Sequence, residues 1–299
     1  MRAALNALTD ELRRLKTAGV KTVAVSEESL AALRAALQGE DGDAPAPVPA
    51  LRAEKTLAPP APAGAGRTPR PPAETFPAAP VVNLPAGDKA ARWSALTELV
   101  RNDPVCRAHL RPGKKAVLGV GNLDAKIMFV GEAPGAEEEV QGEPFVGPAG
   151  QLLNRMIVAT GLARADVYIG NIMNWRPEMA PDQNGVQFGN RPPTPAEMAY
   201  CLPYLRAQIE IVNPDILVAL GASAATGLLG AGAFRALSEV RGQWRDYGGK
   251  PLIVTYHPSY ILRNPTNKSK RLIWDDFLKL MERAGLAISE RQRGYFFEK

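Results

Sequence analysis

The sequence predicts an α/β fold, a three-layer α/β/α sandwich around a central four-stranded parallel sheet. Three observations lead to this prediction: four apolar runs of strand length, helical patterns between them, and a loop rich in glycine and proline directly after the first run. Apolar runs that alternate with helices are typical of parallel strands buried on both faces. The strands are expected at residues 127–130, 167–169, 216–220 and 252–255.

Segments with apolar side chains at helical spacing are expected to cover this sheet. They comprise residues 88–100, 149–160, 195–211, 222–239 and 268–284. A further apolar run at residues 116–120 is expected to pair at an edge of the sheet.

The chain is expected to divide into three parts. Residues 1–40 have leucines at helical spacing, but so short a segment buries too little surface to fold alone. We expect this small helical element to dock on a protein partner or to be only partly ordered. Residues 41–90 hold twelve prolines and thirteen alanines, which predicts a disordered linker. Residues 91–299 are expected to form the folded domain.

Charge and cysteine content favour a cytoplasmic protein with a polyanionic partner. The net charge of +5 and the isoelectric point near 9.2 suit nucleic acid, although neither value identifies it. Two cysteines exclude a disulfide framework and suit a reducing compartment. No apolar run reaches the roughly 18 residues that span a bilayer, so no membrane association is expected. Early acidic residues argue against a secretory signal.

The loop at residues 131–148 is the expected ligand site. It follows the strand at 127–130, contains seven glycines and prolines, and precedes a helical segment. Loops in this position carry the ligand sites of α/β proteins. The loop is neither a GxGxxG fingerprint nor a Walker A loop, and its acidic run at residues 137–139 would repel phosphates.

Five motifs identify a family that the chain resembles. They are GEAPG (131–135), GEPFVGPAGQLL (142–153), GNIMNWRP (170–177), NRPPTPAE (190–197) and TYHPSYILRNP (255–265). In this order and at this spacing they resemble the family 4 uracil-DNA glycosylases. The resemblance implies a monofunctional, monomeric enzyme that flips uracil out of DNA and hydrolyses its N-glycosidic bond without a cofactor for the chemistry.

The resemblance also implies roles for individual residues. Phe145 is expected to stack on the base, and Gly131 to let the backbone approach it. The amide of Asn171 is expected to read the O4 and N3–H edge of uracil, although from the residues alone it would more readily cap a turn. His257 is expected to donate a hydrogen bond to O2, and Glu132 to orient the attacking water.

In the family's motif, the position of Glu132 is associated with orienting or activating the attacking water, or with holding the pocket. Glu138 or Glu139 is a candidate to share this task with Glu132, although most acids in such a run face solvent.

The segment after the histidine is expected to contact DNA. It contains Leu262, Arg263, Lys268, Lys270 and Arg271 and no acidic residue. The basic side chains are expected to neutralise phosphates, and the leucine to wedge into the stack that the extruded base leaves. A solvated basic loop is the alternative.

The chain departs from the family at the iron–sulfur site. Family members usually hold a [4Fe–4S] cluster through four cysteines, and here Cys106 and Cys201 match two of these positions, whereas His109 and Trp175 replace the others. We expect the cluster to be lost, with tryptophan and its neighbours packing the volume. A zinc or other metal on Cys106, His109 and Cys201, or a cluster with unusual ligands, is the alternative. The chain also carries an insertion near residues 178–189.

Two other functions are compatible with the same motifs. One is a DNA-binding relative that has lost turnover, and the other is a glycosylase for another deaminated base. The joint presence of Glu132, Phe145, Asn171 and His257 favours the uracil-DNA glycosylase, because a binding protein has no need to stabilise a leaving base.

Overall fold

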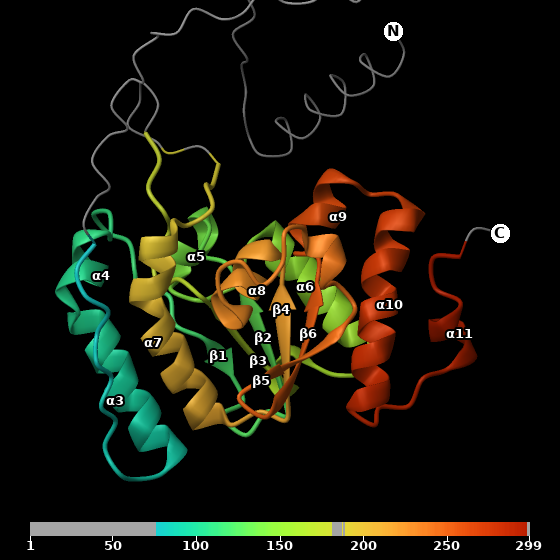
Figure 1. Cartoon of the computed structure of the whole chain (residues 1–299), viewed down its shortest axis with the longest axis horizontal. Coiled ribbons are helices and arrows are strands. Elements are labelled where there is room, and N and C mark those ends of the chain that lie inside the picture. The colour runs from blue at the N-terminus through green and yellow to red at the C-terminus, as the bar shows by residue number, and fades with distance from the viewer. Residues whose placement is uncertain (1–75, 181–186, 188, 298–299) are drawn as a thin grey trace, which may run out of the picture. The chain divides into compact units, whose positions relative to one another are not determined.

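Six strands form one mixed sheet in the computed structural model, which describes residues 76–180, 187 and 189–297 (Figure 1). Their order across the sheet is β1-β3-β2-β4-β6-β5. The strands are β1 (Val120–Gly121), β2 (Ile127–Gly131), β3 (Tyr168–Asn171), β4 (Ile216–Leu220), β5 (Trp244–Tyr247) and β6 (Lys250–Thr255). All described residues belong to the second of two compact units of the chain, Pro69–Lys299.

The four predicted strands form the parallel centre of the sheet, but the sheet is not purely parallel. Strands β3, β2, β4 and β6 pair in parallel, whereas β1 and β5 pair antiparallel at the two edges. Strand β5 was not predicted because it is short and exposes its two middle residues, so it has no apolar run. Gly248 and Gly249, with φ of 59° and 85°, form the tight turn that pairs it with β6.

Helices α3, α6, α7 and α10 agree with the sequence prediction at four of the five predicted places. The helices of the described residues are α3 (Lys89–Asn102), α4 (Pro104–Ala108), α5 (Ala136–Gln141), α6 (Pro148–Ala159), α7 (Pro195–Val212), α8 (Ala222–Leu229), α9 (Ser259–Arg263), α10 (Asn267–Arg283) and α11 (Glu290–Arg293), with 3₁₀ turns η1 (Arg164–Asp166) and η2 (Leu237–Glu239). The helix predicted at 222–239 was wrong in its second half. It ends at Leu229, because Gly230 and Gly232 adopt φ of 96° and 82°.

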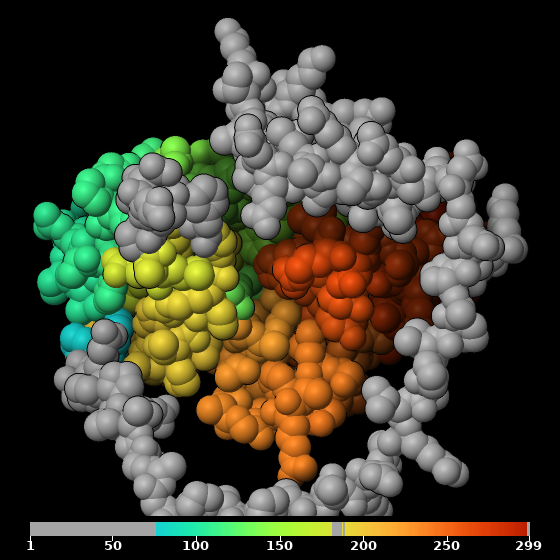
Figure 2. All heavy atoms as spheres, turned by 90° about the horizontal axis from the view of Figure 1, so that it is seen from above, coloured from blue at the N-terminus to red at the C-terminus, as the bar shows by residue number. Residues whose placement is uncertain are grey.

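Helices cover both faces of the sheet, which makes the predicted three layers. Alternate strand residues point to opposite faces: Phe129 belongs to a core that includes residues of α6 and α10, and Met128 to a core that includes residues of α7 and α8. In Figure 2, α7 in yellow and α10 in red lie on opposite sides of the domain. No helix within the described residues is both long and apolar enough to cross a bilayer.

The folded domain begins before the predicted boundary at residue 91. Helix α3 already starts at Lys89, and Phe76, Val82 and Leu84 pack against a third apolar cluster between α3, α4 and α7. These three residues fall within the predicted linker. The predicted element at residues 1–40 and the rest of the linker lie outside the described residues.

A buried carboxylate joins α4 to α7 beside this third cluster. Asp103 accepts a hydrogen bond from the backbone N–H of Cys106 at 2.6 Å and caps α4. It also accepts hydrogen bonds from the hydroxyls of Tyr200 and Tyr204, each at 2.8 Å. Burial pushes the pKa of Asp103 upward, but these hydrogen bonds outweigh burial and hold the pKa below its usual value.

Removal of this carboxylate is expected to destabilise the domain. Asp103→Ala loses a helix cap and leaves two buried hydroxyls without an acceptor, so the free energy of unfolding should fall by on the order of 3 kcal/mol. Asp88→Ala is the matched control, because Asp88 caps α3 without buried partners and its loss should cost about 1 kcal/mol. Urea denaturation measures both values, and equal losses would contradict this role of the tyrosine hydrogen bonds.

Candidate active site

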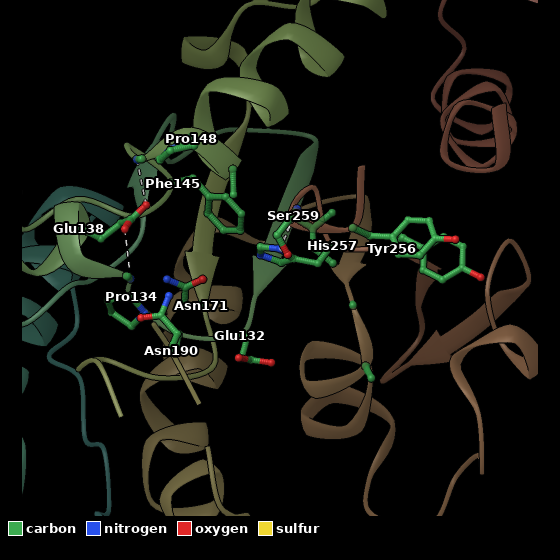
Figure 3. Close-up of a pocket in the computed structure, with 18 of the residues that line it drawn as sticks. Glu132, Pro134, Glu138, Phe145, Pro148, Asn171, Asn190, Tyr256, His257 and Ser259 are labelled. Carbon is green, nitrogen blue, oxygen red and sulfur yellow. Dashed lines mark hydrogen bonds between the residues drawn. The ribbon is translucent and has the colours of Figure 1, made fainter. Parts of the chain in front are cut away.

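A cavity of about 570 Å³ opens at the carboxyl edge of the parallel strands (Figure 3). Its lining includes Glu132 after β2, Asn171 at the end of β3, Gly221 after β4 and His257 after β6. Because parallel strands end at one edge of a sheet, residues far apart in the sequence meet here. The cavity therefore gathers the predicted catalytic and base-binding residues in one place.

Phe145 and Asn171 converge above Gly131. Gly131 pairs with Asn171 across β2 and β3. A Cβ atom on Gly131 would lie 2.4 Å from Asn171 Oδ1 and 2.5 Å from Phe145 Cζ, so only glycine fits between them. The ring of Phe145 also lies close to that of His257, with centroids 5.5 Å apart and planes inclined by 32°. Gly131, Phe145, Asn171 and His257 therefore lie close together at this cavity.

The backbone around Phe145 is held in an unusual conformation. Phe145 has φ of 55°, in the left-handed region that non-glycine residues rarely adopt. Its carbonyl packs so closely on α6 that a Cβ atom on Gly150 would lie 1.9 Å from it. Arg164 donates hydrogen bonds to the carbonyls of Pro144 and Phe145 at 2.7 and 3.2 Å. These contacts fix the direction of the ring.

Glu138 ties together the two loops that form one wall of the cavity. Its carboxylate accepts hydrogen bonds from the backbone N–H groups of Gly135, Val146 and Gly147 at 3.1, 3.1 and 3.0 Å. The side chain is buried, so the expectation that it faces solvent is wrong. Since both oxygens are already bonded to backbone, Glu138 is not suited to activating water.

Glu139 is also buried, and its ion pairs stabilise the loop that contains Asn190. It forms ion pairs with Arg111 and, at 3.0 Å, with Arg176. Arg176 donates in turn to Asn190 Oδ1 at 2.7 Å, and Asn190 lines the cavity. Glu139 therefore supports the cavity from outside and does not enter it. Of the three acids at residues 137–139, only Glu137 is exposed, because Glu138 is bonded to backbone N–H groups and Glu139 pairs with two arginines.

The amide of Asn171 has no partner within the described residues. Its Oδ1 is buried without a hydrogen bond, and no described residue bonds to Nδ2. A buried polar atom without a partner costs free energy unless a ligand satisfies it. An amide in this state presents one acceptor and one donor side by side to a bound molecule.

His257 is fixed as a neutral hydrogen-bond donor. The backbone N–H of Ser259 donates to its Nδ1 at 3.2 Å, and Ser259 Oγ lies 2.9 Å from the same atom. Nδ1 is thus the acceptor, and the proton sits on Nε2. Burial, with a smaller effect from the charge of Arg263, lowers the pKa of His257 to about 4, so the ring is neutral at pH 7.

Glu132 also lines the cavity and lies below Asn171 and His257 in Figure 3. Its Oε2 accepts a hydrogen bond from Ser223 Oγ on α8. Burial raises the pKa of Glu132, while the hydrogen bond from Ser223 and the charge of Arg263 act in the other direction. The site thus contains a carboxylate, a neutral imidazole and an unpaired amide around one aromatic ring.

The predicted DNA-contacting residues fall into two groups. Leu262, Arg263 and Lys268 are exposed on α9 and the start of α10, and Arg263 also lines the cavity. Lys270 lies 5.9 Å from the centre of the Phe296 ring. Arg271 donates to the carbonyls of Arg293 and Tyr295 and pairs with Asp275 at 2.7 Å. We therefore leave Arg271 out of the proposed DNA-contacting set, since its guanidinium is occupied within the fold.

The four positions of the family's iron–sulfur ligands do not form a suitable donor set. Trp175 is fully buried and cannot ligate iron, and its ring stacks on His109 with centroids 4.9 Å apart. Phe76 stacks on both rings at 5.5 and 6.3 Å. Only two thiols, those of Cys106 and Cys201, stand at these four positions, and both are buried. Within the described residues, no three potential ligand side chains are grouped for a metal ion.

Several residues of the site were not singled out by sequence reasoning. Ser259 orients His257, Ser223 binds Glu132, and Asn190 completes the wall. Ser259 lies in the motif TYHPSYILRNP, two residues after His257, so its contact with the histidine could have been predicted from the sequence. Ser223 is 91 residues from Glu132, and no local pattern connects the two.

Comparison with known proteins agrees with this geometry. The profile of the family described as the uracil DNA glycosylase superfamily matches residues 118–278. The type-4 uracil-DNA glycosylase of Thermotoga maritima is 44% identical over 185 residues, which cover 62% of this chain and 90% of that enzyme. Those of Archaeoglobus fulgidus (39% identity, 64% and 94% covered) and Saccharolobus solfataricus (40% identity, 56% and 76% covered) are similar as well.

Loss of the Glu138 carboxylate is expected to loosen the wall of the cavity. In Glu138→Ala, three backbone N–H groups lose a charged acceptor, and the free energy of unfolding should fall by about 3 kcal/mol. Amide hydrogen exchange at Val146 and Gly147 should become faster. Glu137→Gln, in an exposed neighbour, is the control and should change neither. Unchanged exchange at both amides in Glu138→Ala would refute this role of the carboxylate.

Proposed function

Because the chain belongs to the uracil DNA glycosylase superfamily, we propose that it excises uracil from DNA as its type-4 relatives do by name, in the first step of base excision repair. It is a DNA glycosylase, a hydrolase of N-glycosidic bonds. The single observation that carries the proposal is the convergence of Phe145, Asn171 and His257 on one cavity.

Recognition of uracil follows from the unpaired amide. Asn171 Oδ1 accepts from uracil N3–H, and Nδ2 donates to O4. Cytosine presents an acceptor at N3 and a donor at N4, which would leave both atoms of the amide facing groups of the same kind. Phe145 supplies the face on which the base stacks, a contact worth about 1–3 kcal/mol per base.

Extrusion of the base uses the exposed end of the basic segment. Leu262, 46% exposed at the end of α9, is placed to enter the stack where uracil leaves it. Arg263 and Lys268 are exposed as well, and we infer that their charges neutralise the backbone phosphates. The unpaired base then reaches the cavity, which lies next to α9.

Bond cleavage uses the neutral histidine. As the bond between C1′ and N1 breaks, the electron pair moves onto the base and negative charge builds up on O2. The Nε2–H group of His257 donates a hydrogen bond to this oxygen, already aligned by Ser259. A neutral donor suits this task, because it stabilises the charge without giving up its proton. Glu132 orients the attacking water and balances the positive charge that develops on the sugar.

We propose further that this protein works without the iron–sulfur cluster of its relatives. The stack of Phe76, His109 and Trp175 takes the place of a ligand set, and the Asp103 hydrogen bonds hold α4 against α7 nearby. These contacts give the region a packed core that needs no metal. None of them touches the reacting atoms, so the chemistry proposed above does not depend on a cluster.

A cleavage assay tests the proposed activity. The protein is incubated with a uracil-containing oligonucleotide, and alkali then breaks the strand at abasic sites. Wild type should give product, whereas Asn171→Ala and His257→Ala should lower the single-turnover rate by about 10²-fold to 10³-fold. Asn102→Ala, on the exposed end of α3, is the control and should keep the wild-type rate. Binding of uracil DNA without product from wild type would favour the DNA-binding relative instead.

Metal analysis tests the proposed independence from iron. Protein purified without oxygen from iron-rich cultures should be colourless, contain less than stoichiometric iron and unfold at the same temperature with or without a chelator. A brown protein with about four irons per chain would overturn this part of the proposal and leave the glycosylase activity untouched.

A further inference from the structure

Ser223 makes a hydrogen bond that the folding of its own helix does not require. It is the second residue of α8, whose N-cap is Gly221, with no capping bond from a side chain. The Ser223 hydroxyl instead donates to Glu132 Oε2, 91 residues away in the sequence. Strands β2 and β4 are parallel neighbours, with Val130 paired to Ala219, so the residues that follow the two strands meet at the cavity.

The bond occupies one carboxylate oxygen and leaves the other available. Oε2 is bonded to Ser223, whereas Oε1 accepts no hydrogen bond from any residue that the structure describes. Glu132 is half-buried and lines the cavity. A long side chain in this position would otherwise exchange between rotamers, and a hydrogen bond to a charged group is strong enough to select one of them.

We propose that Ser223 is a positioning residue, which holds Glu132 so that Oε1 faces the water that attacks the sugar. The inference rests on the proposed function. Serine does not contact the substrate. It acts only through the carboxylate, and it couples the loop after β2 to the helix after β4.

The step that this arrangement serves is hydrolysis. The water oxygen forms a bond to C1′ while the bond between C1′ and N1 breaks. The electron pair of the broken bond leaves with uracil. One proton of the water passes to Glu132 Oε1, from there to solvent, and solvent protonates the released base. The products are uracil and an abasic sugar with a hydroxyl group at C1′, so atoms and charges balance.

A double-mutant cycle separates this role from a merely structural one. Ser223→Ala should lower the single-turnover rate on uracil DNA roughly tenfold, the loss expected for one hydrogen bond to a charged group. Ser223→Thr keeps the hydroxyl and should restore most of the rate. In a Glu132→Gln background, Ser223→Ala should have almost no further effect. Thr226→Ala, which removes a hydroxyl one turn further along α8, is the control and should keep the wild-type rate.

The pH dependence gives a second readout. Burial raises the pKa of Glu132 and the Ser223 hydrogen bond lowers it, so Ser223→Ala should raise it further. The acidic limb of the rate profile, where the carboxylate becomes protonated, should then move to higher pH. ¹³C NMR titration of the Glu132 carboxyl carbon should show the same shift without any substrate.

The outcomes distinguish this inference from the proposed function. A loss of rate in Ser223→Ala that is the same in both backgrounds, or an unchanged titration of Glu132, would overturn the role of Ser223. If wild type released no uracil, the proposed function would fail, and the NMR titration would still decide whether Ser223 holds the carboxylate. Thermal unfolding of each variant checks that the fold is intact.

Discussion

The carboxylate of Glu138 is the constraint on which the candidate site depends. The loop of Gly135 and the loop of Val146 and Gly147 have no backbone ladder between them, yet they must hold a phenylalanine in an unfavourable conformation. One buried anion with three N–H donors meets this need, because such hydrogen bonds are stronger than those between neutral groups. Together with the hydrogen bonds from Arg164 to the carbonyls of Pro144 and Phe145, this carboxylate offsets the backbone strain at Phe145.

The site also requires that residues far apart in the sequence meet in space. The parallel sheet meets this requirement, because its strands all end at the same edge. Asn171 is the last residue of β3, His257 comes shortly after β6, and Ser223 is the second residue of α8, which follows β4. Asn171 and His257 stand on or shortly after strands of the sheet, which holds the groups proposed to read the base and to stabilise its charge in fixed positions. The charge of Arg263 lowers the pKa of both Glu132 and His257, so the proposed phosphate contact of Arg263 would also affect the two groups proposed for catalysis.

The grouping of the site residues could be expected from the sequence, because they lie in contiguous motifs at strand ends or, for Phe145, in the loop rich in glycine and proline after β2. Phe145, Asn171 and His257 are examples, and the four central strands follow from continuous apolar runs. Strand β5 could not be predicted because an exposed edge strand has no apolar pattern. The burial of Glu138 and the capture of Arg271 by the C-terminal residues depend on contacts between distant segments. The local sequence shows only that Glu138 and Arg271 are charged. From that information alone, the first is expected to face solvent and the second to contact DNA.

The stack of Phe76, His109 and Trp175 restricts how this protein can change over evolutionary time. Trp175 is the largest fully buried side chain among the described residues, so its replacement by cysteine would leave a cavity. That single change would still not complete a set of four thiolates. A single replacement of His109 would remove the ring on which both other rings rest. Either replacement alone would therefore destabilise this region while the set of four ligands was still incomplete. A protein with this stack could gain the four-cysteine set of the family only through both changes together.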